Sequence, residues 1–282
     1  MNILLLIITI TALTFQSPFA KLYNKKTGNR SAYFYSFLLS FVAMIFFVVT
    51  SKNLEFNKAF FIYSVGFALS YGSATVANLL ALRYGSLALT TLIVSFSLMI
   101  PTTYGLIFLN EPTSVWLFLG LLFLAISLFL VHYQKGENKI SLKWLIFVLI
   151  SFIGNGMCST VQKMEQIAFS GGYKNEFMIV SLLIVSVTFL ILSLLTERQH
   201  IKESAKSGFI FPIFVGLLNG LVNLLVMVLG NRMPASLMFP LITSGHIIGS
   251  YILSRFYFKE DLSKMQTIGL FAGIVAVVFF NL

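Results

Sequence analysis

The amino-acid sequence predicts an all-α integral membrane protein with ten transmembrane helices, arranged as two inverted five-helix repeats. Three observations support this prediction. The chain carries very few charges for its length, it divides into ten long apolar runs, and landmark residues of its first half recur in its second half.

The composition excludes a water-soluble globular domain. Hydrophobic residues make up 58% of the 282 residues and charged residues only 10%, whereas soluble domains carry about 25% charged residues. The apolar runs are continuous and do not alternate with polar residues, which favours helices over the strands of a barrel. The net charge of +10 is spread over many short loops, a pattern typical of membrane topology. It predicts no nucleic-acid partner.

Each apolar run is close to the roughly 20 residues that a helix needs to cross a bilayer. We expect polar loops at 21–31, 51–58, 134–142 and 197–207, and tight breaks at 83–85, 110–112 and 232–234. The two tryptophans, Trp116 and Trp144, lie at segment ends, where interfacial aromatic residues concentrate. The ten expected spans are 2–20, 32–50, 59–82, 86–108, 114–133, 143–162, 177–196, 208–230, 234–257 and 265–281.

An internal repeat relates residues 1–135 to residues 136–282. A shift of 149 residues places Arg83 on Arg232 and Glu111 on Glu260, and a shift of 142 places Lys21 on Lys163. Five is an odd number of spans, so the second half enters the membrane in the opposite sense to the first. Inverted repeats of this kind are typical of secondary transporters, whose substrate site lies near the midplane between the halves.

These landmarks resemble the drug/metabolite transporter superfamily, in its ten-helix EamA-like branch. The resemblance covers the whole chain and rests on the two five-span halves, the hairpins around Glu111 and Glu260, the glycines that follow them, and Lys21 with Lys163. It implies solute export or exchange through a cavity lined by the first, third, fourth, sixth, eighth and ninth helices. The first helix departs from the family pattern, because residues 14–18 (TFQSP) lack the Trp-Gly that members often carry.

Polar side chains inside the expected spans are the candidate substrate-binding residues, since polar groups in a bilayer usually face a cavity or another helix. Amides and hydroxyls suit a neutral or zwitterionic solute, and a histidine could couple transport to protons. Hydrogen bonding between helices would account for the same side chains without any ligand. The candidates are Gln16, Ser17, Tyr71, Asn78, Asn155, Ser159, Asn219, Asn223 and His246.

Several other residues are expected to be structural. Glu111 and Glu260 lie at hairpin tips, where we expect each to pair with a basic neighbour or to cap a helix. We expect Lys163 and Glu165 to be solvated near a membrane edge. Three GxxxG patterns allow close helix packing; the third, Gly269–Gly273, could support a homodimer.

The sequence therefore predicts a secondary transporter of a small polar or amphipathic metabolite in the cell membrane, with small-molecule substrate and membrane lipid as its partners. A non-transporting scaffold or partner subunit is the alternative. We expect no enzyme activity, no cofactor and no metal, because the chain has a single aspartate and a single cysteine and lacks a P-loop. Loops after odd-numbered spans hold 14 of the 19 Lys and Arg residues, which places both termini outside. The family resemblance implies cytoplasmic termini instead.

Overall fold

The computed structural model describes residues 2–28, 30–51, 54–84, 93–94, 96–111, 114–132, 142–256 and 264–279. Within these ranges all regular structure is helical. The elements are α1 (Asn2–Thr27), α2 (Ala32–Thr50), α3 (Lys58–Tyr84), η1 (Phe96–Leu98), α5 (Met99–Phe108), α6 (Val115–His132), α7 (Leu142–Ala168), α8 (Lys174–Thr196), α9 (Arg198–Gly208), α10 (Ile210–Gly230), α11 (Ala235–Phe256) and α12 (Lys264–Phe279).

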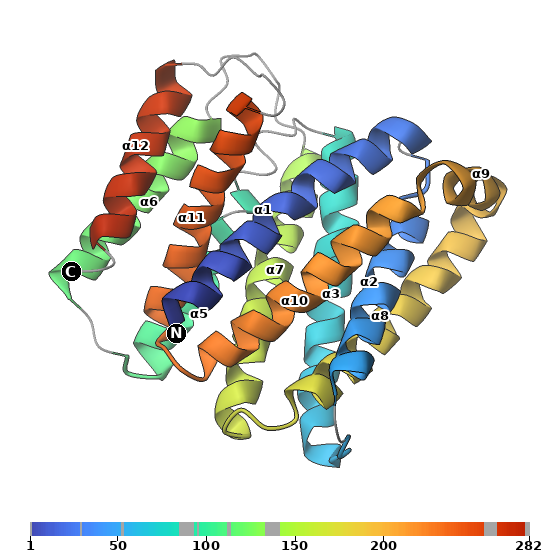
Figure 1. The fold of residues 1–282 in the computed structure, drawn as a ribbon, viewed down its shortest axis with the longest axis horizontal. Helices are drawn as coiled ribbons and strands as arrows, with labels where there is room; N and C mark the ends of the chain where they lie inside the picture. The colour runs from blue at the N-terminus through green and yellow to red at the C-terminus, as the bar shows by residue number, and fades with distance from the viewer. Residues whose placement is uncertain are drawn as a thin grey trace.

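The helices form a bundle in which elements from the two halves of the chain lie side by side (Figure 1). At its centre α1 packs along α10 and α3 packs along α7. The pair α2 and α8 covers one flank, and α5 with α11 covers the other. The pair α6 and α12 lies beyond α5 and α11 at the far end.

One end of the bundle, which we call the amino-terminal side, holds the start of α1 together with the ends of α2, α7 and α10 and the starts of α8 and α11. The turn between α7 and α8 is tight: Gly171 has a φ of +80°, and Tyr173 has a φ of +53°. A Cβ on Gly171 would lie 2.6 Å from Asn231 Nδ2. Glycine is therefore required both for the backbone conformation and for the contact between the two turns on this side.

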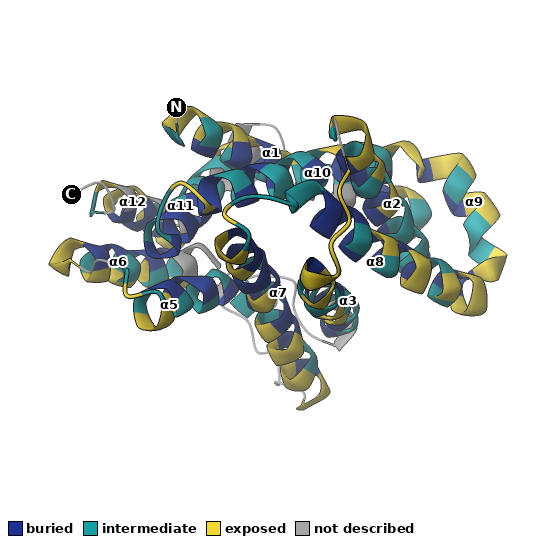
Figure 2. Cartoon of the chain, turned by 90° about the horizontal axis from the view of Figure 1, so that it is seen from below, coloured by how far each residue is buried: buried dark blue, intermediate teal, exposed yellow. Residues whose placement is uncertain are grey.

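Large apolar side chains are exposed on the outward faces of the bundle, while its interior holds many small and polar side chains. Figure 2 shows how buried and exposed residues are distributed over the helices. Large aliphatic residues on these outward faces are well exposed, among them Val49 (77%), Ile62 (74%) and Leu195 (76%). Exposed apolar surface of this extent is typical of a membrane or protein contact. Five described helices are long and apolar enough to cross a membrane, namely α2, α3, α7, α8 and α10, which indicates a membrane protein. Shorter apolar stretches are found in α1, α5, α6 and α12.

Two of the expected loops are wrong. Residues 197–207 were expected to be a loop, but Arg198–Gly208 forms the helix α9. The expected loop at 21–31 is also shorter, because α1 continues to Thr27. Both segments are polar, and their helical structure is stabilised by packing. The buried side chain of Ser204 in α9 bonds to Ser31, and the Glu197 carboxylate accepts the backbone N–H groups of Tyr33 and Phe34 at 2.9 Å each.

Candidate functional site

Four amide side chains form a hydrogen-bonded line across the centre of the bundle, which we call the amide row: Gln16 of α1, Asn219 and Asn223 of α10, and Gln162 of α7. Asn219 Nδ2 donates to Gln16 Oε1 at 3.5 Å, and Asn223 Nδ2 donates to Asn219 Oδ1 at 3.0 Å. Gln162 Nε2 donates to Asn223 Oδ1 at 2.7 Å. The row therefore joins one helix of the first half to two helices of the second.

Helix geometry places these amides on one line. Asn219 and Asn223 lie four residues apart and share one face of α10, and α10 packs against both α1 and α7. At the α7 end, Gln162 Nε2 also lies 3.7 Å from Met178 Sδ of α8. At the α1 end, Gln16 Nε2 is buried and has no hydrogen-bond partner within the described part of the chain.

A polar stripe on α7 continues away from the amide row. Asn155, Ser159 and Gln162 are spaced by four and three residues, which places them on one face of the helix. Asn155 Nδ2 donates to Ser97 Oγ of η1 at 2.8 Å. These hydrogen bonds bring Gln16, Gln162, Asn219 and Asn223 together, while Asn155 is fixed to η1.

The remaining predicted site residues lie on α1, α3 and α11. Tyr71 is half-buried and stacks on Phe67 with ring centroids 5.8 Å apart, and Asn78 is half-buried two turns further along α3. His246 is half-buried in α11, a helix that packs against α1. The side chain of Ser17 lies outside the described residues.

Close glycine contacts bring α11 near the amide row. A Cβ on Gly245 would lie 2.5 Å from Ile10 Cδ1, and one on Gly249 would lie 2.8 Å from Thr14 Oγ1. Both contacts are with α1, on the two turns that precede Gln16. The expectation that this GxxxG pattern supports close packing is therefore confirmed.

A second polar cluster, which we call the clamp, lies on the amino-terminal side and consists of Glu111, Lys163 and the α10–α11 turn. The Glu111 carboxylate accepts the backbone N–H groups of Ala235 and Ser236, each at 2.8 Å, so it caps the start of α11. This confirms the expectation that Glu111 caps a helix and pairs with a basic neighbour. The matching residue Glu260 lies outside the described residues.

Lys163 holds the other end of the same turn. Its Nζ donates to the carbonyl oxygens of Gly230 at 2.7 Å and Met233 at 3.1 Å, and it lies 3.7 Å from Glu111 Oε1. Free carbonyls at the end of α10 and free N–H groups at the start of α11 are thus both satisfied by side chains. The clamp ties the hairpin that follows α5, in the first half, to helices of the second half.

The expectation that Lys163 and Glu165 are solvated is wrong. Lys163 is 7% exposed and Glu165 is fully buried. The expected span ends at residue 162, but α7 continues to Ala168. Its polar last turns pack inside the bundle, which buries both side chains. The internal repeat does indicate a structural role for Lys163 and Glu111, because Lys163 aligns with Lys21 and Glu111 lies in a hairpin that recurs in the second half.

Gly105 makes room for the clamp. A Cβ on Gly105 would lie 2.4 Å from Glu111 Oε2 and 3.2 Å from Ala235 Cβ. The carbonyl of Gly105 also accepts the N–H of Glu111 at 3.2 Å, and Asn110 adopts a φ of +47°. This tight turn directs the carboxylate back across α5 to the start of α11.

A hollow of about 460 Å³ opens on the amino-terminal side beside the end of α10. Leu5, Leu224, Leu225 and Val228 form its apolar walls. Its polar lining is Thr50, Lys174, Asn175 and Arg232.

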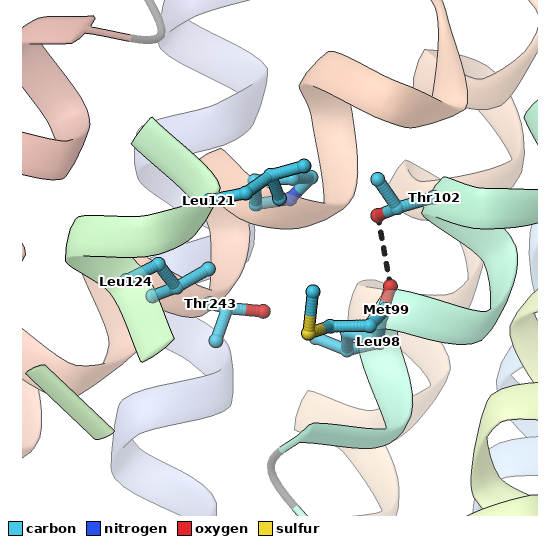
Figure 3. Close-up of a pocket in the computed structure, with 7 residues that line it drawn as sticks. Leu98, Met99, Thr102, Leu121, Leu124 and Thr243 are labelled. Atoms are coloured by element: carbon cyan, nitrogen blue, oxygen red, sulfur yellow. Dashed lines mark hydrogen bonds between the residues drawn. The ribbon is translucent and has the colours of Figure 1, made fainter. Parts of the chain in front are cut away.

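A much smaller hollow of about 10 Å³ lies between α5, α6 and α11, next to Pro240 (Figure 3). Thr102 Oγ1 donates to the carbonyl of Leu98 at 2.9 Å on one side of it, and Thr243 lies on the other. This volume is enough for about one water molecule. Pro240 lies inside α11 and cannot donate to the preceding turn, which makes this a point where α11 can bend.

Comparisons with known proteins establish the fold alone. No family model matches the chain, and no curated protein matches it. A crystal structure of another protein is similar over 99% of this chain and 98% of its own, with a TM-score of 0.80 and 12% sequence identity. The helical arrangement is thus one that a solved protein also adopts over nearly its full length.

Proposed function

We propose that the protein is a secondary transporter that moves a small polar or amphipathic metabolite across the cell membrane by alternating access. In this proposal ten spans form two inverted repeats, residues 1–135 and 136–282, as in the EamA-like branch of the drug/metabolite transporter superfamily. Small-molecule substrate and membrane lipid are its partners, and it carries out no enzyme reaction.

Matched helix packing supports the inverted repeat. If α1, α2, α3, α5 and α6 correspond to α7, α8, α10, α11 and α12, then the packing of α1 on α10 corresponds to that of α7 on α3. The packing of α2 on α10 likewise corresponds to that of α8 on α3. The pairs α2–α8, α5–α11 and α6–α12 each map onto themselves, as a two-fold axis requires.

The amide row is the observation that carries the proposal of a substrate site. It crosses between helices of both halves in the interior of an apolar bundle, and buried amides are costly unless they are hydrogen-bonded. Gln16 Nε2 is buried and has no partner in the described region. The row therefore ends in an N–H group that can donate a hydrogen bond to an oxygen of a solute. A solute bound there would contact both halves, and alternating access requires such contact.

The clamp supports a closed state on the amino-terminal side. Glu111 and Lys163 join the hairpin of one half to the α10–α11 turn of the other. Rocking one half against the other would have to separate these groups. Loss of the clamp would then accompany opening of this side.

A thermal-shift screen of the purified protein in detergent tests the substrate site. The panel contains amino acids, quaternary amines, sugars, nucleosides and nucleotide sugars. A ligand at a hundredfold excess over its dissociation constant stabilises the folded protein by about 2.7 kcal/mol. We expect a stabilising compound whose effect is lost in Gln16→Leu and in Asn223→Ala.

Ser186→Ala is the matched control, because Ser186 Oγ donates to Ser40 Oγ at 3.0 Å in the α2–α8 pair, away from the amide row. Its response to the compound should equal that of the wild type. A panel that leaves the folded wild type unchanged would favour the scaffold function instead. A hit that survives both amide substitutions would show that the compound binds away from the amide row.

A further inference from the structure

The last turns of α7 contain a carboxyl group that neither the clamp nor the amide row uses. Glu165 is fully buried and the adjacent Gln166 is 1% exposed. Gln166 Nε2 donates to Glu165 Oε2. Glu165 Oε1 and Gln166 Oε1 are both buried and have no hydrogen-bond partner among the described residues.

The nearby charges do not neutralise Glu165. Lys163, on the same helix, is occupied by Glu111 and two carbonyls, and within the described ranges Glu165 forms no ion pair. Lys174 and Glu176, of opposite charge, both lie in the first turn of α8. The titratable and charged groups around this end of α7 are Tyr63 of α3, Tyr173, Lys174 and Glu176 at the start of α8, Lys163 with Glu111, and Arg232 after α10.

A comparison with Glu176 shows what Glu165 lacks. Glu176 is also buried, at 7% exposed, and its Oε1 accepts the N–H of Glu55 at 3.1 Å. No residue in the described ranges supplies such a donor to Glu165 Oε1, although Glu165 is the more buried of the two. An ionised carboxylate without compensation is very costly in an apolar interior, so such a group takes up a proton instead.

We propose that Glu165 is the proton-binding group of this protein and that it couples transport to the movement of protons. The proton binds at Oε1, where it forms the neutral carboxylic acid and leaves the bond from Gln166 to Oε2 in place. The carboxylate releases this proton when water enters from the amino-terminal side of the bundle and solvates it. The proton site is inferred from the structure of α7, whereas its coupling to transport rests on the proposed function.

The hollow on the amino-terminal side offers a route for the proton. Lys174 lines it and begins α8, the helix that follows the end of α7. The volume of about 460 Å³ accommodates several water molecules at roughly 30 Å³ each. Asn175 also lines it, and its buried Oδ1 has no partner in the described region, so it can accept a hydrogen bond from such a water.

Infrared difference spectroscopy of the purified protein tests the proton site without any substrate. We expect the wild type to show a protonated-carboxyl C=O band at neutral pH that disappears at alkaline pH. Glu165→Gln should lose this band completely, while Glu176→Gln, the matched control, should retain it. Absence of the band at neutral pH would overturn the proposal, as would a band that persists at neutral pH in Glu165→Gln.

Proteoliposomes then test coupling, with a compound that the thermal-shift screen identifies. Wild type and Glu176→Gln should accumulate the compound in response to a pH gradient. Glu165→Gln should lose this accumulation but still exchange labelled for unlabelled compound. Accumulation by Glu165→Gln equal to that of the wild type would overturn the coupling role. Failure of all three proteins to move the compound would overturn the transport function, while the infrared band would still report the proton site.

Discussion

The clamp and the amide row are both buried polar clusters that join the two halves of the chain, yet they differ in how completely their groups are satisfied. In the clamp, both oxygens of the Glu111 carboxylate accept a backbone N–H, and Lys163 donates to two carbonyls. In the amide row, Gln16 Nε2 has no partner in the described region. A satisfied cluster fixes one arrangement of the helices, whereas an incomplete one has a group available for a ligand.

The number of unsatisfied donors and acceptors distinguishes structural from functional polar residues in this apolar bundle. Both clusters consist of polar side chains at helix–helix contacts, so burial alone does not distinguish them. The distinguishing quantity is the set of donors and acceptors left over after the intramolecular bonds are counted. Substitutions in the clamp should therefore change stability most, and substitutions at the free end of the amide row should change ligand binding most.

The largest loss of stability is expected for Glu111→Ala. It leaves the Lys163 ammonium buried without its carboxylate and frees the N–H groups of Ala235 and Ser236. Breaking a buried pair in this way costs about 3–5 kcal/mol. Unfolding of the purified protein, followed by circular dichroism in detergent, measures the loss.

The double variant Glu111→Gln/Lys163→Met sharpens this result. Neither charge is left unpaired in the double variant. Its free energy of unfolding should therefore exceed the value obtained by adding the losses of the Glu111→Gln and Lys163→Met single variants. Coupling of about 0.5–3 kcal/mol is typical of contacting residues. Strict additivity of the two substitutions would show that the groups do not act as a pair.

Gly105→Ala should have the next largest effect, because its Cβ would meet Glu111 Oε2 at 2.4 Å. Displacing the carboxylate should cost about 1–3 kcal/mol, the usual range for overpacking. Gly72→Ala is the control: a Cβ there meets nothing within 4 Å, and alanine in a helix is up to about 1 kcal/mol more favourable than glycine. Equal destabilisation by both variants would contradict a specific role for Gly105.

Tyr23 tests a satisfied cluster on the opposite side of the bundle. Its hydroxyl donates to the carbonyl of Ser31 at 3.0 Å, so Tyr23→Phe should cost about 1 kcal/mol. Burial raises the pKa of Tyr23 from its ordinary 10.0 to about 12. The stability that neutral Tyr23 contributes is therefore present below about pH 10 and is lost as pH rises through its pKa in the folded protein.

The difference in unfolding free energy between wild type and Tyr23→Phe, measured against pH, should consequently shrink only in this alkaline range. A difference that changes with pH near neutrality would assign the effect to another group.

The smallest effect on stability is expected for Gln16→Leu, within about 1 kcal/mol and of either sign. The substitution removes a long hydrogen bond of 3.5 Å to Asn219, but it also removes a buried donor that lacks a partner. Binding of a compound from the thermal-shift panel should nevertheless be lost. A strong destabilisation by Gln16→Leu would show that the free end of the row is structural.

Prediction from the sequence succeeded where the signal was local. Apolar runs of sufficient length placed the spanning-length helices α2, α3, α7, α8 and α10. The i,i+4 spacing placed Asn219 and Asn223 on one face of α10. The pairing and capping role of Glu111 was also predicted from its position in a hairpin. The homodimer through Gly269 and Gly273 stays a prediction; Gly273 lies against Ser127 of α6, with Ser127 Oγ 2.8 Å from a Cβ placed there.

Prediction failed where polar sequence is buried by packing. The segment 197–207 and the end of α7 are polar enough to read as solvated loops. Yet α9 contributes the buried Ser204, and the end of α7 contributes the buried Lys163 and Glu165. Average polarity carries no information about a partner that lies more than a hundred residues away in the chain, such as Glu111 for Ala235 and Ser236.

The helical structure of this chain and its suitability for a membrane follow from the amino-acid sequence, because hydrophobicity and helix length depend on neighbouring residues alone. The sequence also determined which polar residues lie within the apolar runs. Which of those residues contact one another depends on the folded structure, since hydrogen bonds between helices require the angles and contacts of the assembled bundle. The folded structure alone separates Glu111, whose carboxylate oxygens both accept hydrogen bonds, from Gln16 and Glu165, each of which keeps an atom without a partner in the described region. These two atoms are the basis of the proposed substrate site and of the proposed proton site.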